Sequence, residues 1–317
     1  IGKTLDVTHV LEGSVRKAGS RVRITAQLIK TDDGYHLWSQ TYDHQLDDIF
    51  AIQDQIASMV VESLKVTLLG KEKQPQVIGG TQNTEAFQAY LQGLHYRNRG
   101  SFRDTQVAAR DAFQRAIELD PGYARAWSAL AFALNDLIWN AFIELDEGRQ
   151  GMKHAADKAV ELAPDMAAGH IAMGLYWQQG TPDWLSAGES ISTALQLNPG
   201  NAQVQMEYAR INCNLNRPKK AISAAHKARE LDPISVYAHH LTGHVHYFAR
   251  QYPEAISALR GALELDPEYP KPHYFIACSL YWMGDTEAAL HEIEQEPLAW
   301  MNQYASSVIL HLSLIHI

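Results

Sequence analysis

Apolar and polar positions alternate strictly near the start of the chain, which is the pattern of a β-strand with one buried face. In RVRITAQLI, residues 21–29, the apolar face consists of Val22, Ile24, Ala26 and Leu28. THVLEGSV before this stretch and YHLWSQTY after it have the composition of further strands, and RKAGS and KTDDG supply the turn residues between them. The pattern predicts three antiparallel strands.

The apolar period changes to that of a helix directly after the third strand. Residues 47–68 begin with Asp47 and Asp48, where carboxylates favour a helix N-terminus. Apolar residues then recur at helical spacing: Ile49, Ile52, Ile56, Val60 and Leu64. Residues 1–69 are therefore predicted to form a small, incomplete α+β domain. Residues 70–83 contain glycine and proline and are predicted to be a linker.

From residue 84 onward the chain is helical in pattern, and the endings LDP, LAP, LNP, LDP and LDP recur. Their prolines are Pro121, Pro164, Pro199, Pro233 and Pro267, with spacings of 43, 35, 34 and 34 residues. Proline disfavours helix at the residue before it, so a helix must end at each of these steps. A further amphipathic stretch follows every turn. The regular spacing indicates stacked helical hairpins.

Small residues recur within each unit where the two helices of a hairpin must approach closely. With the proline counted as position 32, position 8 holds Gly93, Ala131, Gly174, Ala209, Gly243 and Ala277. The period and these small residues resemble the tetratricopeptide repeat (TPR). The resemblance implies a mainly α fold, a TPR superhelix of α-α hairpins over residues 84–311, with about six units of which the last is incomplete.

The second unit is the longest, and its extra residues are apolar. Leu137, Ile138, Trp139 and Phe142 are predicted to extend the first helix of the unit or to cover the hairpin. A contact with a partner protein is the alternative.

The segment HVLEGSVRKAGSRVRITAQLIKTDDGYHLWSQTYDHQLDDIFAIQDQIA resembles the TolB-like N-terminal domain of bacterial signalling proteins. In that family the domain precedes TPR units and follows an output module. The module is commonly a class III adenylate or guanylate cyclase, or a winged-helix DNA-binding domain followed by a membrane helix. The strand and helix that usually open the domain are absent apart from residues 1–7, and no residue matches a cyclase metal-binding aspartate or a recognition helix. The resemblance implies a regulatory region of such a protein, which is the expected function of this chain. The alternatives are a fragment of a cyclase and a fragment of a winged-helix activator.

The chain carries 27 Lys and Arg against 36 Asp and Glu, a net charge of −9, which argues against broad nucleic-acid binding. No apolar run approaches the roughly 20 residues needed to span a bilayer. We expect a cytoplasmic location, or a periplasmic one if the intact protein has an upstream membrane helix. Cys213 and Cys278 are the only cysteines, so a disulfide scaffold is excluded.

The last six residues, LSLIHI at 312–317, resemble the translation of a transposase adapter used to prepare sequencing libraries. They are predicted to be a non-native tail, and a genuine short apolar tail is the alternative. The chain begins at Ile1 rather than at Met.

Catalytic motifs are missing from the sequence. It contains no phosphate-cradling glycine loop, no nucleophile elbow and no HExxH motif, and HEIEQ at residue 291 lacks the second histidine of a zinc motif. We expect that this chain is not an enzyme and binds no cofactor.

Four histidines stand close together in HHLTGHVH, residues 239–246. His239 and His246 fall at repeat positions 4 and 11, which are packing positions. His240 and His244 fall at positions 5 and 9, which face the concave groove of TPR arrays. A zinc site would need a third ligand such as Cys278. We prefer the interpretation that these side chains form the groove wall, and we predict no metal.

The groove positions of the fifth and sixth units are rich in aromatic residues with polar tips. They are Tyr237, His240, His244, Tyr247 and Phe248, followed by Lys271, Tyr274, Cys278, Tyr281 and Trp282. Such side chains bury large areas at low entropic cost and suit an extended peptide or a partner helix. The alternative is that further repeats cover some of them. The sequence therefore predicts a protein or peptide partner.

Overall fold

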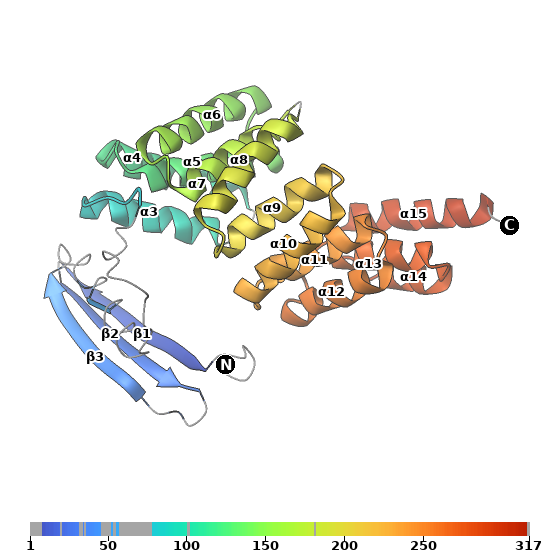
Figure 1. Cartoon of the computed structure of the whole chain (residues 1–317), viewed down its shortest axis with the longest axis horizontal. Helices are drawn as coiled ribbons and strands as arrows, with labels where there is room; N and C mark the ends of the chain where they lie inside the picture. Colours follow the sequence, from blue (N-terminus) through green and yellow to red (C-terminus); the bar gives the residue numbers. More distant parts are fainter. Residues whose placement is uncertain are drawn as a thin grey trace. The chain divides into compact units, whose positions relative to one another are not determined.

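The computed structural model describes residues 8–19, 21–31, 34, 36–45, 52, 55–56, 78–99, 102–180 and 182–315, with the backbone alone at residues 17, 300 and 310–315. The chain divides into two compact units. One comprises residues 1–144 with 158–163, and the other comprises residues 145–157 with 164–317. Each unit is described by itself, and the cartoon in Figure 1 labels its helices and strands.

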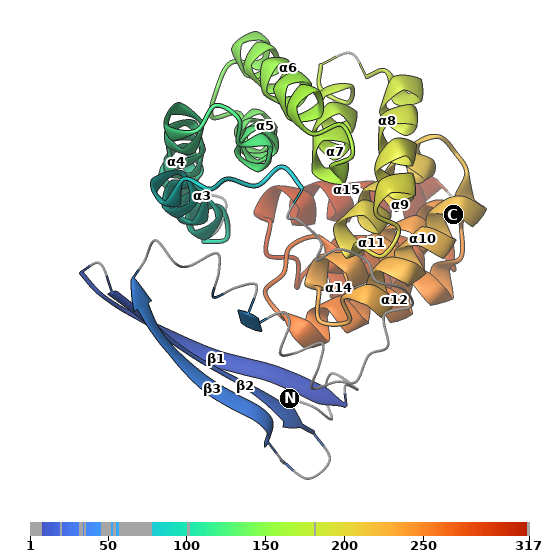
Figure 2. The same cartoon turned by 60° about the vertical axis from the view of Figure 1, so that its left-hand side comes forward.

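A three-stranded antiparallel sheet opens the first unit, as predicted. Its strands are β1 (His9–Ala18), β2 (Arg21–Lys30) and β3 (His36–Gln45), in the order β1-β2-β3. Figure 2 shows the three long strands twisting together. Val22 and Leu28 on β2 are buried, and Val22 packs with Tyr42 and Ile52. Apart from residues 52, 55 and 56, the helix predicted at 47–68 lies outside the described residues, as does the linker before residue 78.

Helices make up most of the other described residues in both units. The first unit holds α3 (Thr84–Arg97), α4 (Arg103–Leu119) and α5 (Ala124–Trp139). Helix α6 (Leu145–Leu162) contributes residues to both units. The second unit continues with α7 (Ala167–Tyr176), α8 (Trp184–Leu197), α9 (Ala202–Asn214), α10 (Pro218–Leu231), α11 (Val236–Phe248), α12 (Tyr252–Leu265), α13 (Pro272–Trp282), α14 (Thr286–Ile293) and α15 (Ala299–Ile315).

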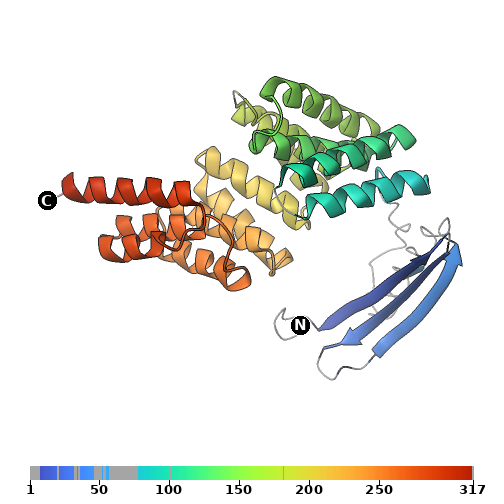
Figure 3. The same cartoon turned by 180° about the vertical axis from the view of Figure 1, so that it is seen from behind.

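Consecutive helices from α7 to α14 pack against one another as antiparallel neighbours, which Figure 3 shows from behind. The sixth hairpin has both of its helices, α13 and α14, and α15 follows it. The backbone of α15 continues through residues 312–315, within the stretch predicted to be a non-native tail. The side chains of that stretch lie outside the described residues.

Small residues allow the hairpins to close, as the sequence predicts. A Cβ atom added at Gly174 would lie 2.6 Å from Ile191 Cδ1 on the facing helix, and one at Gly243 would overlap Leu259. The alanines at positions 20 and 27 are buried where the helices meet: Ala109, Ala187, Ala221, Ala255, Ala289, Ala116, Ala159, Ala194, Ala228 and Ala262. Close helix contact in these hairpins therefore depends on the absence of larger side chains.

A polar side chain at position 4 ties the start of several hairpins to the preceding turn. Trp127 Nε1 lies 2.9 Å from the Pro121 carbonyl oxygen, and His170 Nε2 lies 2.8 Å from that of Pro164. Two further pairs repeat the contact: Gln205 Nε2 with Pro199 O at 2.7 Å, and His239 Nε2 with Pro233 O at 3.0 Å. Three different side-chain types thus satisfy the same carbonyl, which belongs to a turn and has no helical partner.

The sixth hairpin is held by two buried carboxylates instead. His273, its position-4 residue, lies 2.7 Å from Glu292 of α14, and Glu292 also accepts a hydrogen bond from Arg260 at 3.0 Å. Glu296, which is 4% exposed, accepts hydrogen bonds from the backbone amides of Lys271, Tyr274 and Leu298. Lys271 adopts the left-handed conformation with φ of 83°. The first turn of α13 is therefore closed by a side chain from the segment after α14.

The extra residues of the second helical repeat divide between core and surface. Leu137 is fully buried, in agreement with the prediction that α5 is extended. Trp139 is the last residue of α5 and so also extends the helix, but its side chain is 75% exposed and is not part of the core. Trp139 lies two residues after Leu137, so its side chain leaves the helix about 200° around the axis from that of Leu137.

Candidate functional site

Helices α11 and α13 are the first helices of successive hairpins, and they contact one another. Their side chains form a connected group that we call the aromatic cluster. It consists of His240, His244, Tyr247, Phe248, Tyr274, Phe275, Cys278, Tyr281 and Trp282. The structure thus brings together eight of the residues that the sequence predicted for the groove, along with Phe275, which it did not predict.

Phe275 is the centre of the cluster. Its ring centroid lies 4.9 Å from that of His244, 5.3 Å from that of Tyr247 and 5.1 Å from that of Tyr274. The His240 ring is 5.8 Å away. Edge and tilted arrangements at these distances are the favoured geometries for aromatic pairs. Phe275 occupies position 6, outside the positions expected to face the groove, so the repeat pattern did not predict it. Its position next to Tyr274 in the sequence was the feature from which its place in the cluster could have been predicted.

The outer part of the cluster is exposed. Phe248 is 58% exposed and Trp282 is 57% exposed, and each is the last residue of its helix. Tyr247 connects the two helices because its hydroxyl hydrogen-bonds with Trp282 and Cys278. Tyr281 stacks edge-on against Trp282 with ring centroids 5.5 Å apart. A solvent-facing aromatic surface therefore lies over a packed aromatic layer.

Tyr237 lies near the start of α11 and is 37% exposed. It is within electrostatic range of Glu207 and Arg210 on α9 and of Tyr269. Arg210 in turn forms an ion pair with Glu207 and a hydrogen bond with Gln178. Tyr237 therefore extends the exposed aromatic side of α11 towards the ion pair of Glu207 and Arg210 on α9, in the preceding repeat.

The structure corrects the prediction that His240 forms part of the open groove wall. It is only 7% exposed, so its ring forms the floor of the cluster rather than an open groove wall. It packs against Tyr269 at 5.7 Å and His244 at 6.2 Å between ring centroids. Position 5 faces the groove, but the large rings of Tyr269 and Phe275 cover the shorter imidazole.

Both imidazoles of the cluster are held in a neutral environment. Burial, with smaller contributions from His244 and Lys271, lowers the pKa of His240 to about 3. Burial, with Lys271 and Arg210, lowers the pKa of His244 to about 4. The Nδ1 atoms of both rings are buried without a hydrogen-bond partner among the described residues. The charged form is disfavoured because neither water nor a carboxylate reaches these nitrogens.

The environment of Cys278 disfavours metal binding by these residues. Cys278 exchanges hydrogen bonds with Tyr274 and Tyr247, and burial raises the pKa of its thiol. A zinc ligand must be a thiolate, which this environment disfavours. Across the described parts of the chain, no group of three or more His, Cys, Asp or Glu residues is arranged to hold a metal ion. His240, His244 and Cys278 are not brought into such a group.

His239 and His246 occupy packing positions, as the sequence predicts. His246 is 6% exposed, and its Nε2 lies 3.0 Å from His226 Nε2 on α10 while its Nδ1 lies 2.7 Å from Gln251 Oε1. His239 lies against Gly261 of α12, where an added Cβ would come within 2.8 Å of its Nδ1. The four histidines therefore divide between two faces of α11.

Solved structures match this helical arrangement. A thermophilic TPR protein in Thermus thermophilus matches with a TM-score of 0.50 and 16% identity, covering 62% of this chain and 98% of that chain. The repeats have the tetratricopeptide-repeat fold. Pseudomonas aeruginosa pilF matches this TPR chain with a TM-score of 0.51 and 18% identity over 72% of the chain and 99% of pilF. The APC/C hetero-tetramer Cut9-Hcn1 matches with a TM-score of 0.54 and 19% identity, covering 71% of the TPR chain and 46% of the matched chain.

No protein-family model matches the TPR chain. One relative is "Putative adenylate cyclase 3" of Rhizobium meliloti (strain 1021), which is 35% identical over 188 residues. The match covers 56% of this chain and 31% of that protein, so the chain spans about a third of the relative's length. Of the helices that the structure describes, none is long and apolar enough to cross a membrane.

Proposed function

We propose that the chain is a protein-interaction region of a bacterial signalling protein, and that the aromatic cluster with Tyr237 binds a peptide or a helix of a partner protein. The observation that carries this proposal is the exposure of Phe248 and Trp282 at the ends of α11 and α13, above a packed aromatic layer. Contiguous exposed apolar surface on a folded protein usually marks an interaction site.

The geometry supports a partner with large apolar side chains. Phe248 and Trp282 present ring surface to solvent, whereas Tyr247 and Phe275 beneath them are packed and hold the outer rings in place. A preorganised aromatic surface loses little entropy on binding, and buried aromatic anchors are typical hot spots worth about 2 kcal/mol or more each. Lys271 and Arg210 lie within electrostatic range of His244 and would favour a partner segment that also carries a carboxylate.

The test is a double variant, Phe248→Ser with Trp282→Ser, compared with Leu185→Ser. Leu185 on α8 is 67% exposed and lies outside the aromatic cluster, so it is a matched control for loss of exposed apolar surface. A partner captured by the wild-type chain from a lysate of the source bacterium is identified by mass spectrometry, purified and titrated against all three proteins. We expect the double variant to bind at least roughly 30-fold more weakly. Equal affinity for the wild-type and double-variant chains contradicts the proposal.

Residues 1–69 belong, in this proposal, to a TolB-like domain, and the intact protein joins this region to an adenylate or guanylate cyclase domain. The support is the resemblance of HVLEGSVRKAGS and YHLWSQTYD to that family and the 35% identity to part of "Putative adenylate cyclase 3". Reading the gene upstream of the codon for Ile1 tests this directly. A class III catalytic domain is expected, and a basic winged-helix domain followed by a membrane helix would assign the chain to a transcription activator.

If the cyclase domain lies outside residues 1–317, the isolated chain should have no cyclase activity. Because it contains no residue set for nucleotide cyclisation, purified residues 1–317 should form no cyclic AMP or cyclic GMP from the nucleotide triphosphates. The full-length protein should form one of them. Turnover by the isolated chain would show that a catalytic site lies within these residues.

A further inference from the structure

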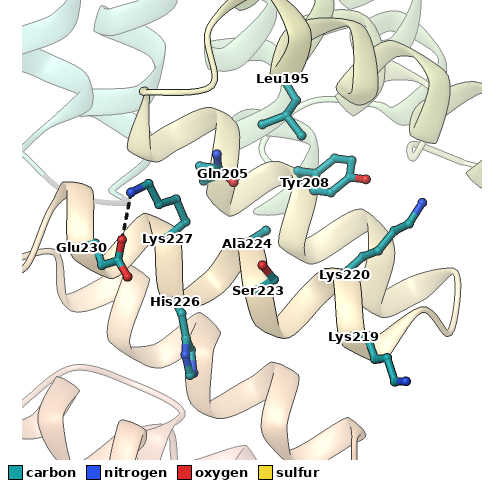
Figure 4. A pocket seen from close by; sticks show the side chains of 10 residues that line it. All are labelled: Leu195, Gln205, Tyr208, Lys219, Lys220, Ser223, Ala224, His226, Lys227 and Glu230. Atoms are coloured by element: carbon teal, nitrogen blue, oxygen red, sulfur yellow. Dashed lines mark hydrogen bonds and ion pairs between the residues drawn. The ribbon is translucent and has the colours of Figure 1, made fainter.

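A pocket of about 600 Å³ lies on α8, α9 and α10, away from the residues of the aromatic cluster. Figure 4 shows its side chains: Leu195 comes from α8 and Tyr208 from α9, and Lys220, Ser223, Ala224 and Lys227 come from α10. Ala224 is 5% exposed and forms part of the floor. The small side chains of Ser223 and Ala224 leave the space between the two lysines open.

The pocket is basic although the chain as a whole is acidic. Lys219, Lys220 and Lys227 line it together with a single carboxylate, Glu230, whereas the net charge of the chain is −9. Lys227 pairs with Glu230 at 2.9 Å, one turn along the same helix. Within the described residues, no carboxylate forms an ion pair with Lys219 or Lys220. At Lys219 and Lys220 the pocket therefore offers positive charge without an ion-pair partner among the described residues, whereas Lys227 shares its charge with Glu230.

The spacing of the lysines indicates which kind of anion fits. Lys220 and Lys227 are two helical turns apart, about 10 Å along the axis of α10, and Figure 4 shows them at opposite ends of the row formed with Ser223 and Ala224. A single phosphate is bound by donors that converge on one point. In a polyproline II segment, which has three residues per turn and a rise of about 3.1 Å per residue, carboxylates at positions i and i+3 lie on one side about 9 Å apart. This is close to the spacing of the two lysines.

The apolar residues of the pocket lie between these charges. Leu195 and Ala224 present aliphatic surface, and the Tyr208 ring forms the adjoining wall. Ser223 is exposed and its hydroxyl can bond a peptide group. We infer that the pocket on α8, α9 and α10 binds an acidic peptide segment of a partner protein, with two carboxylates at Lys220 and Lys227 and an apolar side chain between them. This site is additional to the aromatic cluster and does not depend on it.

The test uses a labelled peptide that favours the polyproline II conformation and carries aspartates at positions i and i+3 with a leucine between them. Binding is followed by fluorescence anisotropy at about 150 mM salt, where long-range charge effects are screened. Lys220→Ala with Lys227→Ala should weaken saturable binding roughly tenfold or more. Ser223→Trp, which fills the pocket and keeps every charge, should weaken it as strongly. A peptide with asparagines in place of the aspartates should not bind.

Lys158→Ala is the matched control, because Lys158 pairs with Glu161 on α6 in the same arrangement as Lys227 with Glu230. It should leave the affinity unchanged, as should the double variant of Phe248 and Trp282. The inference is overturned if Lys158→Ala weakens binding as much as the pocket variants do. It is overturned equally if the asparagine peptide binds as well, or if inorganic phosphate at matched ionic strength displaces the acidic peptide.

Discussion

Gly243 on α11 lies directly against Leu259 on α12, so close that a Cβ atom at position 243 would overlap the Leu259 side chain. The same Cβ would lie 3.0 Å from the Ala255 carbonyl oxygen, which belongs to the backbone and cannot move aside. The two helices of this hairpin can therefore approach this closely only because residue 243 has no side chain.

Gly243→Ala should destabilise the chain by about 1–3 kcal/mol. Alanine has a higher helix propensity than glycine by about 1 kcal/mol, but overlap with two neighbours in a packed hairpin outweighs this gain. Urea unfolding followed by circular dichroism measures the change. Gly200→Ala is the control, because an added Cβ there meets no atom within 4 Å. An unchanged midpoint for Gly243→Ala would mean that the hairpin opens at no cost.

Stability should fall as the pH falls below about 6.5. The folded-state pKa values of His240 and His244 are lowered to about 3 and about 4, so below pH 6.5 the unfolded chain binds protons that the folded chain does not. Each histidine then costs at most about 1.4 kcal/mol per pH unit, until the pH reaches its folded-state pKa. Hydrogen exchange of the α11 and α13 amides at pH 7.5 and pH 5 should show faster opening at the lower pH.

Replacing the imidazoles of His240 and His244 tests whether these two groups cause the pH dependence. His240→Phe with His244→Phe keeps the aromatic packing and should flatten the pH dependence of opening in α11 and α13. His291→Gln, at an exposed position on α14, should leave the dependence as it is in the wild type. If the phenylalanine variant keeps the full pH dependence, other groups are responsible for it.

The hydrogen bond from the position-4 side chain to the proline carbonyl should form with either histidine or glutamine at position 4. His239→Leu removes the hydrogen bond to the Pro233 carbonyl and should cost about 1 kcal/mol, whereas His239→Gln should retain most of the stability. Glutamine serves because Gln205 makes the same contact with Pro199 one unit earlier. Thermal unfolding of the three proteins gives the comparison. Equal loss in both variants would mean that the imidazole acts through packing against Gly261 and not through the bond.

Zinc should not stabilise the chain. Cys278 forms hydrogen bonds with Tyr274 and Tyr247, and burial raises the pKa of its thiol, so zinc would have to break these hydrogen bonds and remove the proton. Isothermal titration with zinc and the thermal midpoint with and without zinc measure binding to the folded chain. Saturable binding that Cys278→Ala abolishes would place a metal at His240, His244 and Cys278 after all.

The sequence predicted those features that depend only on the position of a residue within its own repeat or strand. Gly243 and the other small residues of position 8 stand where two helix backbones meet, and the alternation around Val22 identifies the buried face of one strand. These are local properties with a fixed period, and they can be read without knowing the neighbouring units.

The remaining features depend on neighbours that the period does not specify. His240 is covered by two large rings, Tyr269 at the end of its own repeat and Phe275 in the following repeat. Trp139 is exposed because it lies on the opposite side of α5 from Leu137. The pocket on α8, α9 and α10 arises where three helices meet, although its lysines are visible in the sequence as PKKAISAAHKAREL. Contacts of this kind require the relative positions of successive helices.

The carboxylate of Glu296 has a consequence for the order in which the chain can fold during its synthesis. Helices α9 and α11 are capped by Asn201 and Ser235, which stand directly ahead of them and leave the ribosome first. The first turn of α13 is closed by a residue that is made after both helices of its own hairpin. Earlier hairpins can therefore mature as they emerge, whereas the sixth must wait for the chain that follows it.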